Sequence, residues 1–151
     1  MLKLRVPPAL VFIICLGLMW GIHRYFSFSW SVIEAKAWLY SIPMIAGVLI
    51  ALAGTFEFSR NKTTVNPHKP ENTSVFVQSG IYRISRNPMY LGMALILAGA
   101  ALKWGHMANL LVPPLFILYM NTFQILPEEE VMEQKFGEAF REYKERVRRW
   151  V

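Results

Sequence analysis

The chain has 151 residues, the size of a single domain. Hydrophobic residues make up 54% of it and charged residues only 17%, against about 25% in ordinary soluble domains, so the composition argues strongly against a conventional soluble protein. The formal net charge is +6, but the basic residues are dispersed around apolar blocks instead of covering a polar surface, which argues against a nucleic-acid partner. We therefore predict one membrane-embedded domain over residues 1–151.

Metal-ligating residues are scarce in this sequence. The single cysteine, Cys15, lies inside an apolar run, and His23, His68 and His106 are too far apart to suggest a ligand cluster. The sequence therefore predicts neither a disulfide framework nor a metal site.

Four apolar blocks each approach the roughly 20 residues that a helix needs to cross about 30 Å of hydrocarbon. We expect an all-α integral membrane protein with four transmembrane helices, at about residues 9–26, 37–58, 89–102 and 107–126. Lys3 and Arg5 before the first block are also compatible with a cleaved signal peptide. The aromatic residues after that block are typical of an interfacial belt and favour a retained span.

The distribution of Lys and Arg predicts the orientation in the membrane. The N-terminus, residues 59–88 and the C-terminal tail together hold 13 of the 16 basic residues. Because cytoplasmic segments of membrane proteins carry an excess of positive charge, we expect both termini and the loop of residues 59–88 in the cytoplasm.

Small residues predict that the second and third helices pack closely. The second block carries Gly47, Ala51 and Gly54, and the third carries alanines at positions 94, 98 and 101. Side chains of this size let two helix backbones approach each other in a membrane.

The fourth block combines two prolines with two amides. Pro113 and Pro114 are expected to kink the helix, because proline lacks the N–H that the helix ladder needs. Asn121 and Gln124 lie three residues apart and therefore share one helix face. They are candidates for contact with a substrate, and hydrogen bonding between helices is the alternative.

The C-terminal segment predicts an interfacial amphipathic helix over about residues 128–150. Pro127 and the three glutamates after it are typical of a helix start. Apolar residues then recur at spacings of three and four, which predicts a stripe facing the membrane interface or the underside of the bundle: Phe136, Phe140, Tyr143, Val147 and Trp150.

Residues 59–88 form a connection longer than a helix bundle needs, and long ordered loops are often functional. Arg86 lies where this loop enters the third span. Its position is compatible with an anchor that reaches the membrane interface and equally with a buried functional cation.

The second half of the chain resembles a known family. The motifs are Ser79-Gly80-Ile81-Tyr82, then Arg86-Asn87-Pro88-Met89-Tyr90-Leu91-Gly92, a predicted hairpin, Glu128-Glu129, Phe136-Gly137 and Tyr143. Their order and spacing are similar to those of the membrane methyltransferases that include isoprenylcysteine carboxyl methyltransferases and phospholipid methyltransferases. The resemblance runs from about residue 63 to the C-terminus. It implies S-adenosylmethionine as the cofactor, bound between the last membrane helices and a cytoplasmic loop.

The resemblance also implies roles for individual residues. It places the adenosyl pocket along Ser74, Val75, Phe76 and Val77, and further cofactor contacts at Tyr82, Asn87, Pro88, Met89, Tyr90, Glu128 and Glu129. We expect Arg86 to orient an anionic or polar acceptor, and Glu129, with Glu128 as the alternative, to position the cofactor.

The predicted activity is transfer of a methyl group from S-adenosylmethionine to a lipid-like or membrane-partitioned acceptor, such as an isoprenylcysteine carboxylate or a phospholipid amine. The alternative is a non-enzymatic membrane scaffold or a transporter subunit. Transporters typically show inverted repeats or charged residues deep within their spans, and this sequence shows neither.

Overall fold

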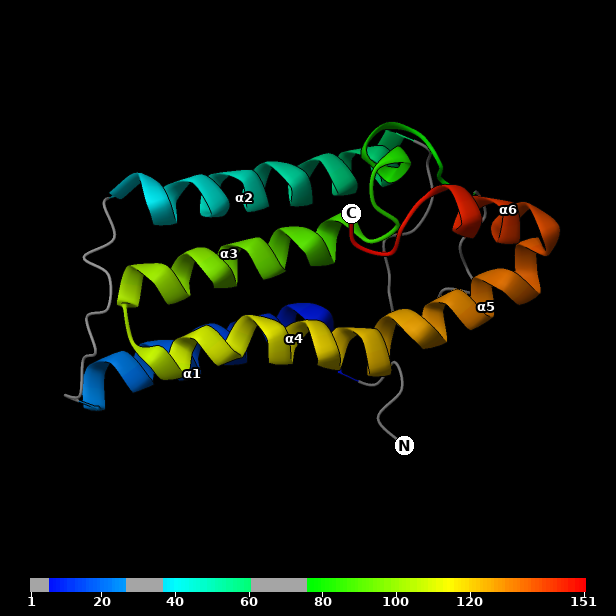
Figure 1. Cartoon of the computed structure of the whole chain (residues 1–151). Coiled ribbons are helices and arrows are strands. Elements are labelled where there is room, and N and C mark those ends of the chain that lie inside the picture. Colours follow the sequence, from blue (N-terminus) through cyan, green and yellow to red (C-terminus); the bar gives the residue numbers. More distant parts are fainter. Residues whose placement is uncertain (1–5, 27–36, 61–75) are drawn as a thin grey trace.

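The structure is a computed structural model that describes residues 6–26, 37–60 and 76–151. Every regular element in these ranges is helical (Figure 1), so the all-α prediction is confirmed for them. The elements are α1 (Pro8–Tyr25), α2 (Ala37–Arg60), the 3₁₀ turn η2 (Gly80–Arg83), α3 (Pro88–Trp104), the 3₁₀ turn η3 (Met107–Leu111), α4 (Val112–Met120), the π-helical turn η4 (Asn121–Ile125), α5 (Leu126–Phe136) and α6 (Glu138–Arg146).

Three stretches of helix are long and apolar enough to cross a membrane: Pro8–Tyr25, Ala37–Arg60 and Met107–Phe136. The apolar helix α3 is shorter, and its 17 residues extend about 25 Å. Large apolar side chains are exposed along α2, where lipid is the environment that would favour them: Trp38, Ile42, Ile45, Val48, Leu49, Leu52 and Phe56. The chain is therefore a multi-pass membrane protein with three or four spanning helices.

Helix α3 lies in the middle of the bundle. It packs along α2 on one side and against α1 and α4 on the other (Figure 1). The start of α1, the end of α2, the start of α3 and both C-terminal helices lie at the same end of the bundle. That end also carries nine of the eleven Lys and Arg residues in the described ranges, namely all except Arg24 and Lys103.

Glycines bring α2 and α3 into backbone contact. A Cβ added to Gly47 would lie 2.5 Å from the carbonyl oxygen of Gly92, and one added to Gly54 would lie 3.0 Å from the Met89 side chain. The small face expected on α2 is therefore confirmed. On α3 the contacting residues are Gly92 and Gly99, whereas two of the three alanines expected there, Ala94 and Ala101, belong to the core on the α1 and α4 side.

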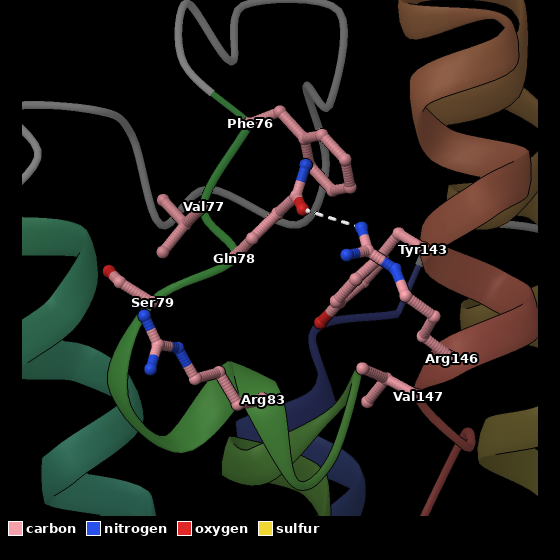
Figure 2. A pocket seen from close by; sticks show the side chains of 8 residues that line it. All are labelled: Phe76, Val77, Gln78, Ser79, Arg83, Tyr143, Arg146 and Val147. Atoms are coloured by element: carbon pink, nitrogen blue, oxygen red, sulfur yellow. Dashed lines mark hydrogen bonds between the residues drawn. The ribbon is translucent and has the colours of Figure 1, made fainter.

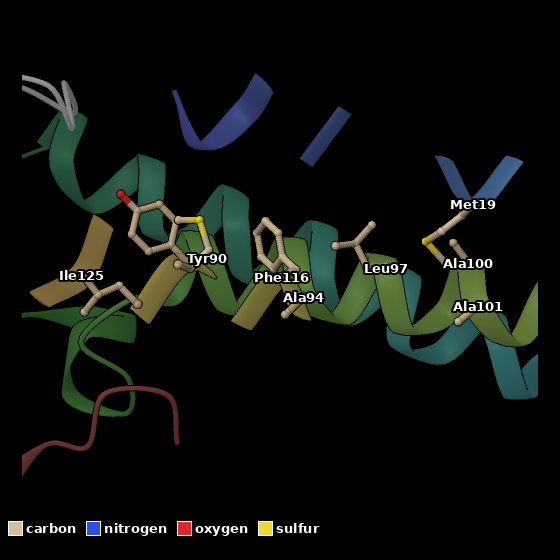
Figure 3. Close-up of a cluster of buried hydrophobic side chains, with 9 residues drawn as sticks. Met19, Tyr90, Ala94, Leu97, Ala100, Ala101, Phe116 and Ile125 are labelled. Atoms are coloured by element: carbon tan, nitrogen blue, oxygen red, sulfur yellow. The ribbon is translucent and has the colours of Figure 1, made fainter. Parts of the chain in front are cut away.

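The main apolar core lies between α3, α1 and α4 (Figure 3). Its buried members follow α3 along its length and are joined by one residue of α1 and by residues of α4 and η4: Met19, Tyr90, Ala94, Leu97, Ala100, Ala101, Phe116, Met120 and Ile125. This packing fixes the start of α3, from which Tyr90 projects toward the basic end of the bundle.

The fourth predicted span contains irregular helical turns that the sequence did not predict. Pro113 and Pro114 lie in the first turn of α4, directly after the 3₁₀ turn η3, where a helix has no use for the missing N–H groups. The kink expected at these prolines stays a prediction. A further irregular turn, η4, lies just before Pro127 and widens the helix. Helix α5 continues from it without a break, so Pro127 does not start a separate helix.

The C-terminal helix predicted over residues 128–150 is two helices. The break is at Gly137, whose φ of +53° is a backbone conformation that residues with a side chain rarely adopt. Helix α6 ends at Arg146, and the following residues turn back toward α3 (Figure 1). The predicted stripe is buried against the protein itself, because Phe140 and Tyr143 pack with Phe76 and α5.

The glycine contact generates a test of the packing between α2 and α3. Gly47→Ala places a methyl group against the backbone of Gly92, and we expect it to lower the free energy of unfolding by about 1–3 kcal/mol. Gly17→Ala in α1 is the matched control, because a Cβ there has nothing within 4 Å. Thermal unfolding midpoints in detergent measure both variants, and equal midpoints would contradict the close approach.

Candidate functional site

A cavity of about 590 Å³ lies at the basic end of the bundle (Figure 2). The chain before α3 forms one wall and α6 with the residue after it forms the other. We call it the α6 cavity, and its lining residues are Phe76, Val77, Gln78, Ser79, Arg83, Tyr143, Arg146 and Val147. Its volume is within the range of about 300–1,000 Å³ that is usual for small-molecule sites.

Hydrogen bonds hold the two walls in place. The Ser79 hydroxyl donates to the buried Glu57 carboxylate of α2 at 2.6 Å, and this anchors the loop side. The Tyr143 hydroxyl donates to the backbone carbonyl of Tyr82 at 2.6 Å, and this ties α6 to η2. Arg146 also donates across the cavity to the side chain of Gln78 at 3.4 Å, shown as the dashed line in Figure 2.

A buried ion-pair cluster lies at the start of α5, and we call it the Glu129 centre: Arg86, Glu129 and Arg149. Arg149 contacts both carboxylate oxygens of Glu129, through Nε at 3.2 Å and Nη2 at 2.7 Å. Arg86 contacts the same carboxylate through Nη2 alone, at 3.2 Å. The Glu129 and Arg86 side chains are only 10% and 11% exposed, so both charges are largely withdrawn from water.

Arg86 is incompletely satisfied in this cluster. Its Nε and Nη1 atoms are buried and have no hydrogen-bond partner among the residues that the structure describes. Burial lowers the pKa of the Arg86 guanidinium, the Glu129 carboxylate opposes that shift, and the Arg149 cation adds to it. Two buried donors on one cation are a suitable site for an anionic oxygen group.

A second polar group lies beside this centre, and we call it the Glu128 cluster: Tyr90, Gln124 and Glu128. The Tyr90 hydroxyl donates to Oε1 of Glu128 at 2.7 Å, and the Gln124 amide donates to the same oxygen at 2.6 Å. The π-helical turn carries Gln124, and α3 carries Tyr90. The carboxylate of Glu128 is therefore held between two helices.

Tyr143 connects the α6 cavity with these polar clusters. It lines the cavity, and its hydroxyl binds the backbone of Tyr82. Burial raises the pKa of Tyr143, and the charge of Arg86 opposes the shift. Burial also raises the pKa of Tyr82, with the Glu128 carboxylate among the further causes. Tyr143 and Tyr82 therefore link the cavity electrostatically to Arg86 and Glu128.

The residues predicted to bind the cofactor separate into several groups. Phe76 and Val77 line the α6 cavity, whereas Ser74 and Val75 lie outside the described residues. Tyr82 is buried beneath the cavity. Pro88 and Met89 face Gly54 in α2.

The remaining predicted residues are engaged with other parts of the chain. The Asn87 side chain donates to the backbone carbonyl of Arg149 at 3.0 Å. Asn121 accepts a hydrogen bond from the Trp150 indole at 3.1 Å, and Gln124 belongs to the Glu128 cluster.

Several residues of the site were not anticipated from the sequence: Gln78, Ser79, Arg83, Arg146 and Arg149. Tyr143 and Arg146 are three residues apart, and this spacing places them on one helix face, so Arg146 could have been found. Arg149 could not have been predicted, because its contact with Glu129 depends on the chain turning back after α6. Within the described ranges, no group of His, Cys, Asp or Glu is arranged to hold a metal ion.

Comparison with protein families matches residues 35–139 to the phospholipid methyltransferase family. The match includes α2, α3, α4 and α5, and the chain belongs to this family of methyltransferases. An uncharacterized protein of Haemophilus influenzae is 46% identical over 63 residues, which are 42% of this chain and the whole of that protein. No solved structure matches the chain.

The Glu129 centre generates a stability prediction. Glu129→Gln leaves two arginines, one of them buried, without their carboxylate, and we expect it to lower the free energy of unfolding by about 3 kcal/mol. Glu133→Gln, one turn further along α5, is the matched control. Its pairs with Arg141 and Lys144 are more exposed, so its loss should stay below about 1 kcal/mol. Similar unfolding midpoints for both variants in detergent would refute the central role of Glu129.

Proposed function

We propose that the protein transfers a methyl group from S-adenosylmethionine to a lipid-like or membrane-partitioned acceptor. The observation that carries this proposal is the α6 cavity, whose lining residue Tyr143 binds the backbone of Tyr82 and lies within the electrostatic influence of the incompletely satisfied Arg86. Membership of a methyltransferase family supports the reaction type. The arrangement supports a cofactor on the cavity side and an acceptor on the Arg86 side.

The lining of the α6 cavity fits S-adenosylmethionine chemically. Phe76 and Tyr143 offer aromatic faces for an adenine ring or a sulfonium cation. Arg83 and Arg146 match the charge of its carboxylate, and the cavity is wide enough for a ligand of this class. When bound, S-adenosylmethionine supplies an electrophilic methyl group on a sulfur that leaves readily.

The two glutamates take different roles in this proposal. Glu129 is occupied by Arg86 and Arg149, so it serves to hold Arg86 in place. Glu128 is fixed by Tyr90 and Gln124 and becomes the residue that contacts the amino or ribose end of the cofactor. This assignment reverses the preference for Glu129 that the sequence motif alone suggests.

The chain's residues mainly align the two reactants and exclude water. Arg86 uses its two remaining donors to orient a polar or anionic part of the acceptor. Asn121 acts indirectly on the acceptor side because it holds Trp150, and Gln124 acts on the cofactor side because it holds Glu128. Asn87, Pro88 and Met89 set the start of α3 through their contacts with the C-terminal tail and α2.

Cofactor binding tests this function against a non-enzymatic scaffold. S-adenosylhomocysteine should bind the purified protein in detergent calorimetry, and Arg146→Ala should weaken that binding about tenfold, because it removes one charge-assisted contact. Arg141→Ala is the matched control on α6, since its side chain is exposed and lies outside the cavity lining. It should bind like the wild type.

Absence of binding to the wild type at millimolar ligand would favour the scaffold. Equal affinity of the Arg146→Ala and Arg141→Ala variants would remove the α6 cavity from the cofactor site while leaving methyl transfer open.

We further propose that the basic end of the bundle, with both termini, faces the cytoplasm. In a Cys15→Ser background, Gln134→Cys in α5 and Lys103→Cys at the end of α3 place single exposed thiols at opposite ends. A membrane-impermeant thiol reagent applied to intact cells should label position 103 and spare position 134. Labelling at position 134 but not at position 103 would show the opposite orientation. Labelling at both positions would contradict the proposed orientation.

A further inference from the structure

The residues after α6 return to the start of α3. The backbone N–H of Arg86 donates to the carbonyl of residue 148 at 3.0 Å, and Asn87 donates to the carbonyl of Arg149. The Trp150 indole donates to Asn121 in the π-helical turn, and its ring packs against the main core. These contacts place the Arg149 side chain over Glu129.

Arg149 and Arg86 compete for one carboxylate. A guanidinium that meets a carboxylate alone tends to take both oxygens with two parallel N–H groups. Here Arg149 occupies both oxygens of Glu129, and Arg86 reaches only Oε1 through a single nitrogen. The other two nitrogens of Arg86 stay without partners in the described part of the chain.

We propose that Arg149 is a positioning residue: by occupying Glu129, it keeps the Nε and Nη1 donors of Arg86 available for a phosphate of the acceptor's head group. Without Arg149, Arg86 would turn to take both oxygens of Glu129, and its donors would be consumed inside the protein. This inference rests on the proposed function only in assigning Arg86 to the acceptor.

Charge supports a phosphate as the ligand of these donors. Two arginines share one glutamate in the Glu129 centre, so its three side chains carry a formal net charge of +1. A buried cation with free donors is costly unless an anion meets it. A phosphate offers several acceptor oxygens and matches the planar guanidinium.

The test compares Arg149→Ala and Arg149→Lys with Arg148→Ala. Arg148 is the matched control, because its side chain is exposed and its backbone carbonyl survives the substitution. Lysine keeps the charge of Arg149 but cannot bind both oxygens in the same way, so Arg149→Lys should behave like Arg149→Ala. Arg149→Lys also provides a folded variant if Arg149→Ala is unstable.

The first readout is steady-state methyl transfer from S-adenosylmethionine to dihexanoylphosphatidylethanolamine. Arg149→Ala should raise KM for this lipid about tenfold and leave kcat and the affinity for S-adenosylhomocysteine within about threefold of the wild type. In an Arg86→Ala background, Arg149→Ala should change KM less than twofold, because Arg149 affects the lipid only by positioning Arg86. The inference would be overturned if Arg149→Ala raised KM as much in the Arg86→Ala background as in the wild type. It would also be overturned if Arg149→Ala and Arg148→Ala had equal KM values, or if Arg149→Ala also lost affinity for S-adenosylhomocysteine.

The second readout does not require methyl transfer. Dihexanoylphosphatidylethanolamine should raise the thermal unfolding midpoint of the wild type, whereas dihexanoylglycerol, which lacks the phosphate, should not. Arg149→Ala and Arg149→Lys should lose this stabilisation, and Arg148→Ala should keep it. If inorganic phosphate raised the unfolding midpoint as much as the lipid does, the site would be one for free anions. Phosphate-dependent stabilisation in a protein without methyl transfer would reject the proposed function and retain the role of Arg149.

Discussion

The buried carboxylate of Glu129 is the constraint on which the basic end of the structure depends. It joins α5, the loop before α3 and the tail after α6, which are distant in sequence. Withdrawing a carboxylate from water is unfavourable unless cations and hydrogen bonds replace the solvent, and two guanidinium groups do so here. Three segments must therefore reach their final positions together. The same pairing leaves Arg86 with donors that the protein does not use.

Helix packing within the membrane also fixes the position of the polar residues at the basic end of the bundle. The glycine contacts between α2 and α3 allow their backbones to approach, and the main apolar core holds α3 against α1 and α4. Because both faces of α3 are constrained, Tyr90 at its first turn has a defined distance to Glu128. Small residues near the centre of the bundle therefore determine the geometry of polar groups at its end.

The sequence allowed the apolar helices and the face of small residues on α2 to be predicted, because these features are local or periodic. The change from a 3₁₀ turn to an α-helix just before Pro113 was not predicted, since the apolar pattern of η3 and α4 is continuous. The break at Gly137 depends on a positive φ that no periodicity reveals. The roles of Glu128 and Glu129 could not be separated either. Adjacent glutamates look equivalent in a motif, and only the returning tail distinguishes them.

The arrangement also offers a physical reason for using two separate polar clusters. Under the proposed function, a cationic cofactor and a phosphate-bearing acceptor would require surroundings of opposite charge, and one cluster cannot provide both. The Glu128 carboxylate lies on one side with Tyr90, and the net positive Glu129 centre lies on the other with the donors of Arg86. Tyr143 is buried, lines the cavity and lies close enough to Arg86 for that charge to affect its pKa. Adjacent glutamates on one helix turn can thus serve opposite electrostatic purposes, because one is held by neutral donors and the other by two cations.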